Sequence, residues 1–126
     1  MGTKTLTTQL DISSPTINGI FTLNTTTDQT FSFDDTAVVT STAEAVTGAG
    51  GTQLIAAGTA KIQYVYIKNI EAPGGNFATL ETDGNEDWGR LEAGNWAFFP
   101  VAPSVGLQVK GDTGSVTIEY AIFQAP

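Results

Sequence analysis

The chain contains no cysteine and no histidine among its 126 residues. Without cysteine it can form neither a disulfide framework nor a thiolate metal site. Without histidine it lacks the commonest general base and the commonest imidazole ligand for metals. Serine or cysteine nucleophiles that depend on a histidine are therefore impossible within this chain. These absences predict a protein that is not an enzyme and that needs no cofactor.

Basic side chains are also scarce: 5 lysines and arginines stand against 13 aspartates and glutamates, which gives a formal net charge of −8. The basic residues are scattered, so no positive stripe can neutralise phosphates, and binding to nucleic acid or to anionic lipid is disfavoured. No apolar run approaches the length of a membrane span, and the N-terminus lacks the basic and apolar regions of a secretory signal. We therefore expect no nucleic-acid partner, no membrane partner and no signal-dependent export.

What the chain does have is a series of short β-prone runs separated by turn signals. The runs recur at intervals of roughly 8–12 residues, which is typical of an all-β sandwich or barrel. A chain of 126 residues is long enough for one domain with a sizeable core. We therefore expect a single β-sandwich domain over residues 1–126.

The stretch from Lys61 to Ile70 (KIQYVYIKNI) predicts a central strand. Successive strand residues point to opposite faces, so Tyr64 shares a face with Ile62, Tyr66 and Ile70, while Val65 and Ile67 share the other. A strand that is apolar on both faces is covered on both sides. One face should look into the core, and the other should meet a second layer or a neighbouring subunit.

The N-terminal run from Thr3 to Ile12 alternates cleanly, with Leu6, Leu10 and Ile12 on one face. The segment Ser13-Ser14-Pro15 then breaks the strand. Two interpretations stay open for residues 1–14. They form either an extended arm that adds a strand to a partner, or an edge strand of the chain's own sandwich, because both need the same alternation.

Other boundaries follow from propensity and turn chemistry. We expect a strand over Ile20 to Thr26, a turn at residues 27–29 and a short strand over Thr30 to Phe33. The stretch from Ala37 to Val46 is rich in alanine, but its Val-Val-Thr-Ser-Thr start favours a strand. Residues 111–114 (GDTG) predict a tight hairpin between the last two strands.

Aromatic side chains gather at Trp88, Trp96, Phe98 and Phe99. Burial in the core is their most common fate. Exposed, they would anchor a subunit interface or stack on sugars. Pro100 follows them and should either stop the strand or place it at a sheet edge, because proline cannot donate to a ladder.

The acidic loop places Asp83, Asn85 and Asp87 at alternate positions, like the start of a calcium loop. The likeness then ends, because Trp88 stands where the turn glycine belongs and Gly94 where the closing glutamate belongs. We expect a solvated acidic turn, of the kind that Asp, Asn and Gly form for conformational reasons. Asp83, Asn85 and Asp87 remain the only candidate metal ligands.

A glycosidase needs two carboxylates in a cleft that perturbs their pKa values. The sequence offers carboxylates but nothing that fixes their separation. We expect no such activity from the following residues: Glu81, Glu86, Asp87 and Glu92.

From Tyr64 to Gln124 the chain runs YVYIKNI, a glycine-rich turn, an acidic loop ending in WGRLEAGNWAFFPV, and then GLQVKGDTGSVTIEYAIFQ. This layout, over about half of the chain, resembles the small virion structural proteins of tailed bacteriophages. The matching positions are Leu91, Gly94, Trp96 to Pro100 and Val116 to Phe123. The resemblance implies a jelly-roll or related β-sandwich, a homo-oligomer that is often a trimer, and contacts with the major capsid protein. It transfers no functional residue.

We therefore expect a capsid cement or decoration protein on the outside of the virion, assembled in the host cytoplasm. The charge of −8 disfavours a position that faces packaged DNA. A tail or head–tail component, and a carbohydrate-binding or receptor-binding module, remain as alternatives. The candidate partner-binding residues are Leu6, Leu10, Ile12, Trp88, Trp96 and Phe99.

Overall fold

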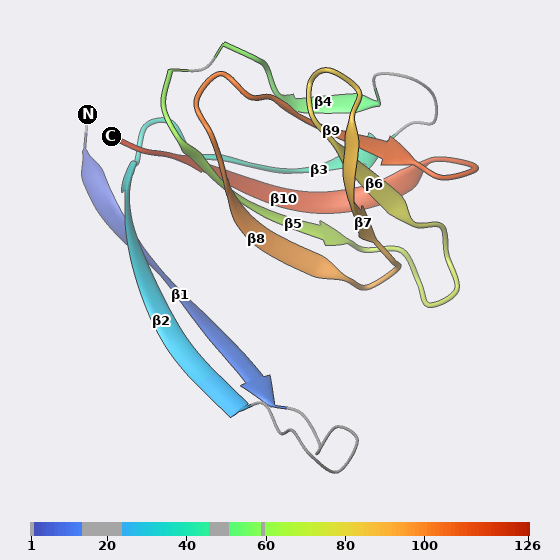
Figure 1. Ribbon diagram of the computed structural model, residues 1–126, viewed down its shortest axis with the longest axis horizontal. Helices are drawn as coiled ribbons and strands as arrows, with labels where there is room; N and C mark the ends of the chain where they lie inside the picture. Colours follow the sequence, from blue (N-terminus) through green and yellow to red (C-terminus); the bar gives the residue numbers. More distant parts are fainter. Residues whose placement is uncertain (1, 14–23, 46–50, 59) are drawn as a thin grey trace.

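The computed structural model describes residues 2–13, 24–45, 51–58 and 60–126, and within these ranges it contains ten strands and no helix (Figure 1). The all-β prediction is confirmed. The strands are β1 (Thr3–Ser13), β2 (Asn24–Asp34), β3 (Val39–Ala45), β4 (Thr52–Ile55), β5 (Gln63–Asn69), β6 (Ala78–Glu81), β7 (Asp87–Leu91), β8 (Trp96–Val101), β9 (Leu107–Gly111) and β10 (Val116–Gln124).

Eight of the strands form two four-stranded antiparallel sheets, in the orders β3-β10-β5-β8 and β4-β9-β6-β7. Strands pair in a mirrored way along the sequence: β3 with β10, β4 with β9, β5 with β8 and β6 with β7. Successive pairs therefore alternate between the two sheets. The two sheets pack face to face as a β-sandwich.

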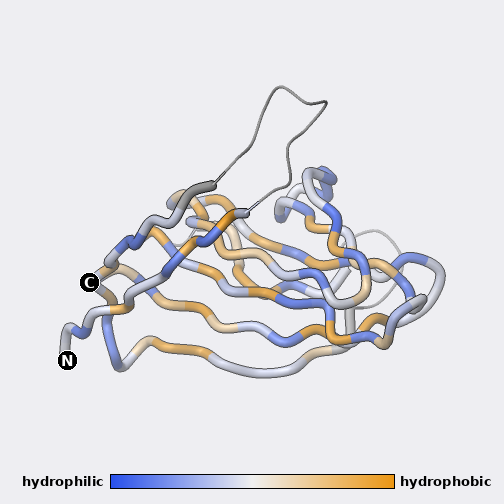
Figure 2. Tube along the Cα trace, turned by 90° about the horizontal axis from the view of Figure 1, so that it is seen from below, coloured by the Kyte–Doolittle hydropathy of each residue, from blue (hydrophilic) through white to orange (hydrophobic). Residues whose placement is uncertain are grey.

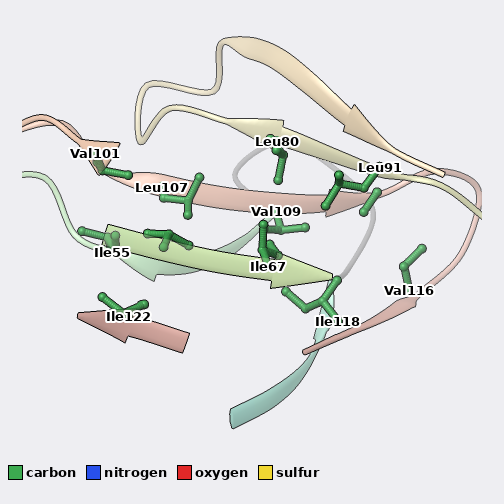
Figure 3. Close-up of a cluster of buried hydrophobic side chains, with 12 residues drawn as sticks. Ile55, Ile67, Leu80, Leu91, Val101, Leu107, Val109, Val116, Ile118 and Ile122 are labelled. Carbon is green, nitrogen blue, oxygen red and sulfur yellow. The ribbon is translucent and has the colours of Figure 1, made fainter. Parts of the chain in front are cut away.

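The core fills the space between the two sheets. Along β5 the exposure alternates: Val65 and Ile67 are fully buried, while Tyr64 and Tyr66 are half-buried on the outer face. The prediction of a central strand covered on both sides is confirmed, because β1 and β2 lie across that outer face (Figure 2). Figure 3 shows the inward-pointing side chains, among them Ile55, Ile67, Leu80, Leu91, Val101, Leu107, Val109, Val116, Ile118 and Ile122.

The first two strands form a hairpin of their own. All 11 residues of β1 pair with β2, from Thr3↔Asp34 to Ser13↔Asn24. The turn predicted at residues 27–29 is wrong, because β2 runs through it without interruption. Threonines on both sides give this stretch enough β-propensity to override Asp28. Residues 20–23, the start of the predicted second strand, lie outside the described ranges.

The predicted hairpin at residues 111–114 is also wrong. The segment joins β9 to β10, but these strands belong to opposite sheets and do not pair with each other. Instead Gly111 pairs with Ala78 of β6, and the amide of Asp112 donates to the carbonyl of Phe77 at 3.2 Å. Glycine and aspartate turns reverse the chain equally well within a sheet and between sheets. Turn chemistry alone therefore could not choose the partner.

Two further expectations about strands are confirmed. The alanine-containing stretch forms β3, and β8, which contains Pro100, is an edge strand of its sheet. Along β10, Val116, Ile118 and Ile122 are buried and Tyr120 is half-buried.

Candidate functional site

The β1–β2 hairpin is fixed to the sandwich at its base, where β2 packs against the C-terminal strand β10 (Figure 1). Gly2 and Asp35 close the hairpin through two hydrogen bonds of 3.0 Å, one from each backbone amide. The ring of Phe33 packs edge-on against Phe123 of β10, with centroids 5.2 Å apart. Phe31 packs against the outer face of β5. The base is therefore held by aromatic contacts and backbone bonds together.

Beyond Phe31 the hairpin diverges from the sheet and leaves a cleft of about 620 Å³. Its floor is the outer face of β5 and β8, where Tyr66 pairs with Phe98 and Lys68 with Trp96. Its opposite wall is the hairpin, and the described residues that line it are Thr8, Gln9, Leu10, Thr27, Gln29, Tyr66, Lys68, Trp96 and Phe98. The cleft thus joins an aromatic floor to a wall of hydroxyl and amide side chains.

Contacts with neighbouring residues hold the floor of the cleft in position. The hydroxyl of Tyr66 donates to the carboxylate of Glu119 on β10, at 2.9 Å. Burial, and then the adjacent Glu119 carboxylate, raise the pKa of the Tyr66 hydroxyl. Trp96, at the mouth of the cleft, remains 57% exposed. An exposed indole beside a fixed phenol is a platform that a ligand can cover.

The structure divides the six candidate partner-binding residues into two groups. Leu10 and Trp96 line the cleft, and Leu6 and Ile12 lie half-buried on the same alternating face of β1 as Leu10. Each member of this first group therefore lies on the hairpin or at the cleft.

Trp88 and Phe99 form the second group, at the border where β7 and β8 meet. Their rings pack edge to face with centroids 5.1 Å apart, and they line a smaller hollow of about 300 Å³. Burial in the core, the first expectation for the aromatic cluster, is wrong for both tryptophans, because Trp88 is 51% and Trp96 57% exposed. The expectation of burial holds in part for Phe99, which packs against the core from a half-buried position.

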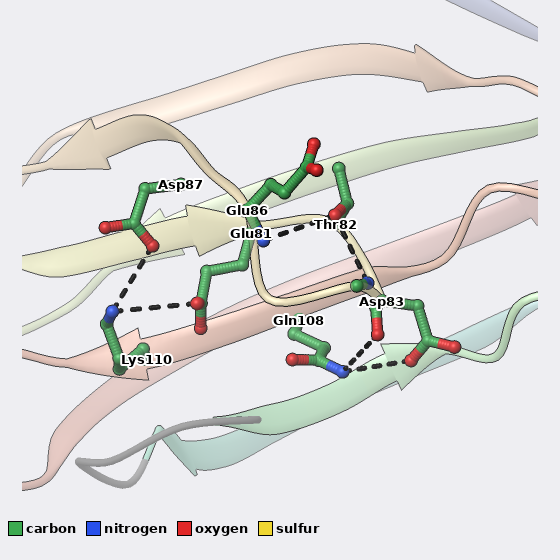
Figure 4. A network of polar contacts seen from close by, with 8 residues as sticks. Glu81, Thr82, Asp83, Glu86, Asp87, Gln108 and Lys110 are labelled. Carbon is green, nitrogen blue, oxygen red and sulfur yellow. Dashed lines mark hydrogen bonds and ion pairs between the residues drawn. The ribbon is translucent and has the colours of Figure 1, made fainter.

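The acidic loop forms a polar network in which the carboxylates are directed to separate partners (Figure 4). The carboxylate of Asp83 accepts hydrogen bonds from the side-chain amides of Gln108 and Gln53 and from the backbone amide of Ala57. The bond from Gln108, and then that from Gln53, hold the pKa of Asp83 below its ordinary value of 3.8. Asn85, with φ of 65°, occupies the left-handed conformation of a turn.

Asp87 faces Lys110, whose ammonium lies 3.2 Å from it and 3.6 Å from Glu81. The hydrogen bond to Asp87 is the main reason that the pKa of Lys110 is raised. The side chain of Glu81 is almost fully buried, and its second oxygen has no hydrogen-bond partner among the residues that the structure describes. No group of three potential metal ligands among His, Cys, Asp and Glu gathers within the described ranges.

The carboxylates considered for glycoside cleavage lie away from the cleft. Glu81 forms an ion pair with Lys110, and Glu92 forms one with Arg90 at 2.6 Å. None of the four carboxylates belongs to the cleft lining. No carboxylate is among the described residues that line the cleft.

Sequence reasoning did not find the polar half of the cleft. Gln29 and Thr27 gave no motif, and the hairpin that brings them over β5 depends on long-range packing. The available signal was the outward face of β5, where Tyr64 and Tyr66 indicated a covering layer without identifying it.

Comparison of this chain with models of known protein families, with curated proteins and with solved structures found no match. The described part of the chain holds no helix that is long and apolar enough to cross a membrane.

Proposed function

We propose that this chain is a non-enzymatic structural protein of a phage virion, a cement or decoration protein that binds the outer surface of the capsid. The observation that carries the proposal is the β1–β2 hairpin. It stands on the sandwich by its base, and each of its strands has 11 residues, which is about 35 Å of extended chain. A hairpin of this length can reach a neighbouring subunit while the sandwich stays outside.

The edges of the hairpin supply a means of attachment. Within the described ranges β1 pairs only with β2, and β2 only with β1. The outer edge of each strand therefore presents backbone amides and carbonyls that another chain can pair with. Strand addition of this kind gives affinity through backbone hydrogen bonds, and Leu10, 44% exposed, adds apolar contact. Of the two interpretations of residues 1–14, this supports the arm, with β2 as part of it.

The strand order supports a jelly-roll. A jelly-roll has eight strands in two sheets, formed as two Greek keys. The orders β3-β10-β5-β8 and β4-β9-β6-β7, with mirrored pairs in alternate sheets, are those expected when one long hairpin is rolled up. Viral capsid proteins and lectins both use this architecture, so it fits the proposal without deciding it.

A homo-oligomer, with a trimer favoured, is part of the proposal. The exposed Trp88, at the border between the two sheets, supports it, because symmetric contacts repeat the same patch on each subunit. Multi-angle light scattering at micromolar concentration should give about three times the mass of the chain. A monomer would remove this part of the proposal.

The test of attachment uses capsids of the phage that encodes the chain, stripped of this protein. We expect the intact protein to co-sediment with them and to raise their thermal stability. Leu10→Asp should abolish binding, because it places a charge on the face of the hairpin that docks. Thr7→Asp, on the opposite and exposed face of β1, is the matched control and should bind normally. Equal binding by both variants and the intact protein would show that the hairpin is not the attachment element.

A further inference from the structure

We propose that the cleft between the β1–β2 hairpin and the outer face of β5 and β8 is a binding site for an uncharged oligosaccharide. The site shares Leu10 with the hairpin face to which capsid attachment is assigned above, whereas its aromatic floor takes no part in that attachment. It would let a protein fixed on a particle hold a surface glycan.

The aromatic floor fits the apolar faces of sugar rings. Trp96 and Phe98 alternate with inward residues on β8, and Tyr66 lies beside Phe98 on the neighbouring strand. The hydrogen bond from Tyr66 to Glu119 holds the phenol ring in place. A flat, preformed aromatic surface costs little conformational entropy when a ligand covers it, and the C–H face of a pyranose is apolar enough to pack on it.

The opposite wall supplies hydrogen-bonding groups that have no side-chain partner among the described residues. Gln29 lies on the cleft face of β2, directly across from Thr8, and its side-chain amide makes no hydrogen bond to any residue in the described ranges. Thr8 and Thr27 add hydroxyl groups, although that of Thr8 also bonds the carbonyl of Gln29 at 3.4 Å. Amides and hydroxyls both donate and accept, as sugar hydroxyls do. Such a wall recognises a polyol better than an aliphatic ligand.

The charge of the cleft favours a neutral ligand. Among the described residues of the lining, Lys68 is the only charged one, and its direct cross-strand neighbour on β10 is Glu119. The two opposite charges offset each other, so neither an anion nor a cation gains much at this site. A volume of about 620 Å³ is within the range of small-ligand sites and accommodates an oligosaccharide of a few residues.

The two tryptophans of the chain provide a matched test, because both are about half exposed and only Trp96 lines the cleft. Trp88→Phe leaves Trp96 as the only indole, and Trp96→Phe leaves Trp88. Each protein is titrated with cellotriose, maltotriose, mannotriose and triacetylchitotriose up to about 10 mM, which detects weak, millimolar binding. We expect at least one trisaccharide to shift the fluorescence of the Trp88→Phe protein and none to shift that of Trp96→Phe.

Calorimetry or saturation-transfer NMR then measures affinity in variants with an unchanged thermal midpoint. Trp96→Ala and Gln29→Ala should each weaken binding about tenfold or more, and Trp88→Ala should leave it unchanged. The proposal is overturned if no trisaccharide binds, if Trp88→Ala and Trp96→Ala weaken binding equally, or if only a charged sugar such as sialyllactose binds. If Trp96→Ala impairs capsid binding and no sugar binds, the cleft docks protein, and the proposal is equally overturned.

Discussion

The ring of Phe31 on β2 lies 4.4 Å from the ring of Tyr64 on β5, measured between centroids, and 5.5 Å from the ring of Phe98 on β8. This contact marks the point at which the hairpin leaves the sandwich. On the base side of it the hairpin is packed and bonded; on the distal side the cleft opens. One aromatic residue therefore fixes both the angle of the hairpin and the width of the cleft.

Replacement of Phe31 by alanine should loosen the hairpin without unfolding the sandwich. Losing a half-buried aromatic ring should cost about 1–3 kcal/mol, less than the cost at a fully buried site. The protection of β1 and β2 amides against hydrogen exchange should fall, while that of β5 and β10 should persist. Leu10→Ala, a change on the distal hairpin, is the control and should cost less than about 1 kcal/mol. Uniform loss of protection across all strands would contradict this division.

The sequence predicted most strands, because alternation and β-propensity are local properties. In Lys61 to Ile70 the alternation separated Val65 and Ile67 from Tyr64 and Tyr66, as the structure does, but it did not say which of the two faces looks into the core. Pro100 likewise predicted a strand end or an edge strand, since a missing amide is tolerated only there.

Strand partnership could not be predicted, because it depends on loop closure over long distances. Residues 111–114 looked like a hairpin turn but connect two sheets, and Thr3–Ser13 found its partner in Asn24–Asp34 rather than in a sandwich sheet. The cleft follows from this second pairing. Its polar wall exists only when Thr8 and Gln29 are carried over Tyr66, and nothing local to either residue indicates that.

Two isoleucines of the same segment should differ sharply when truncated. Ile67 is fully buried between the sheets, whereas Ile70, just past the end of β5, is 40% exposed. Ile67→Ala should destabilise the protein by about 2–5 kcal/mol through lost burial and a cavity. Ile70→Ala should cost about 1 kcal/mol or less. Urea unfolding monitored by circular dichroism measures both, and equal losses would contradict the assignment of faces along this segment.

Gly106 should be irreplaceable for reasons of space. A Cβ atom there would overlap the side chain of Asp83 and would lie 2.7 Å from the carbonyl oxygen of Ile55. Gly106→Ala must therefore shift two backbone segments, and we expect a loss of about 2–4 kcal/mol, in the range for overpacked sites. Gly84→Ala is the control, because only the Thr82 hydroxyl lies near, at 3.6 Å. Thermal unfolding should show a large drop for the first variant and a small change for the second.

Acid should lower the stability of the folded protein, because the carboxylate of Asp83 links β4 to β9 through hydrogen bonds. Its carboxylate accepts from Gln108, Gln53 and the amide of Ala57, and these bonds hold its pKa below 3.8. A carboxyl group whose pKa is lower in the folded state stabilises that state above its unfolded pKa of about 3.9, and the contribution disappears as pH falls through the folded pKa. Asp34 acts in the same direction, because its hydrogen bonds from Thr36 also lower its pKa.

We therefore expect stability to change little between pH 7 and pH 5 on account of these two groups and to fall below about pH 4. Asp83→Asn should be less stable than the native chain at pH 7, because one amide cannot accept all the bonds that the carboxylate accepts. It should also lose less stability on acidification, and the Asp34→Asn, Asp83→Asn double variant should lose still less. Urea unfolding at pH 7, 5 and 3 gives the three slopes. Parallel losses in all three proteins would mean that other groups control the acid response.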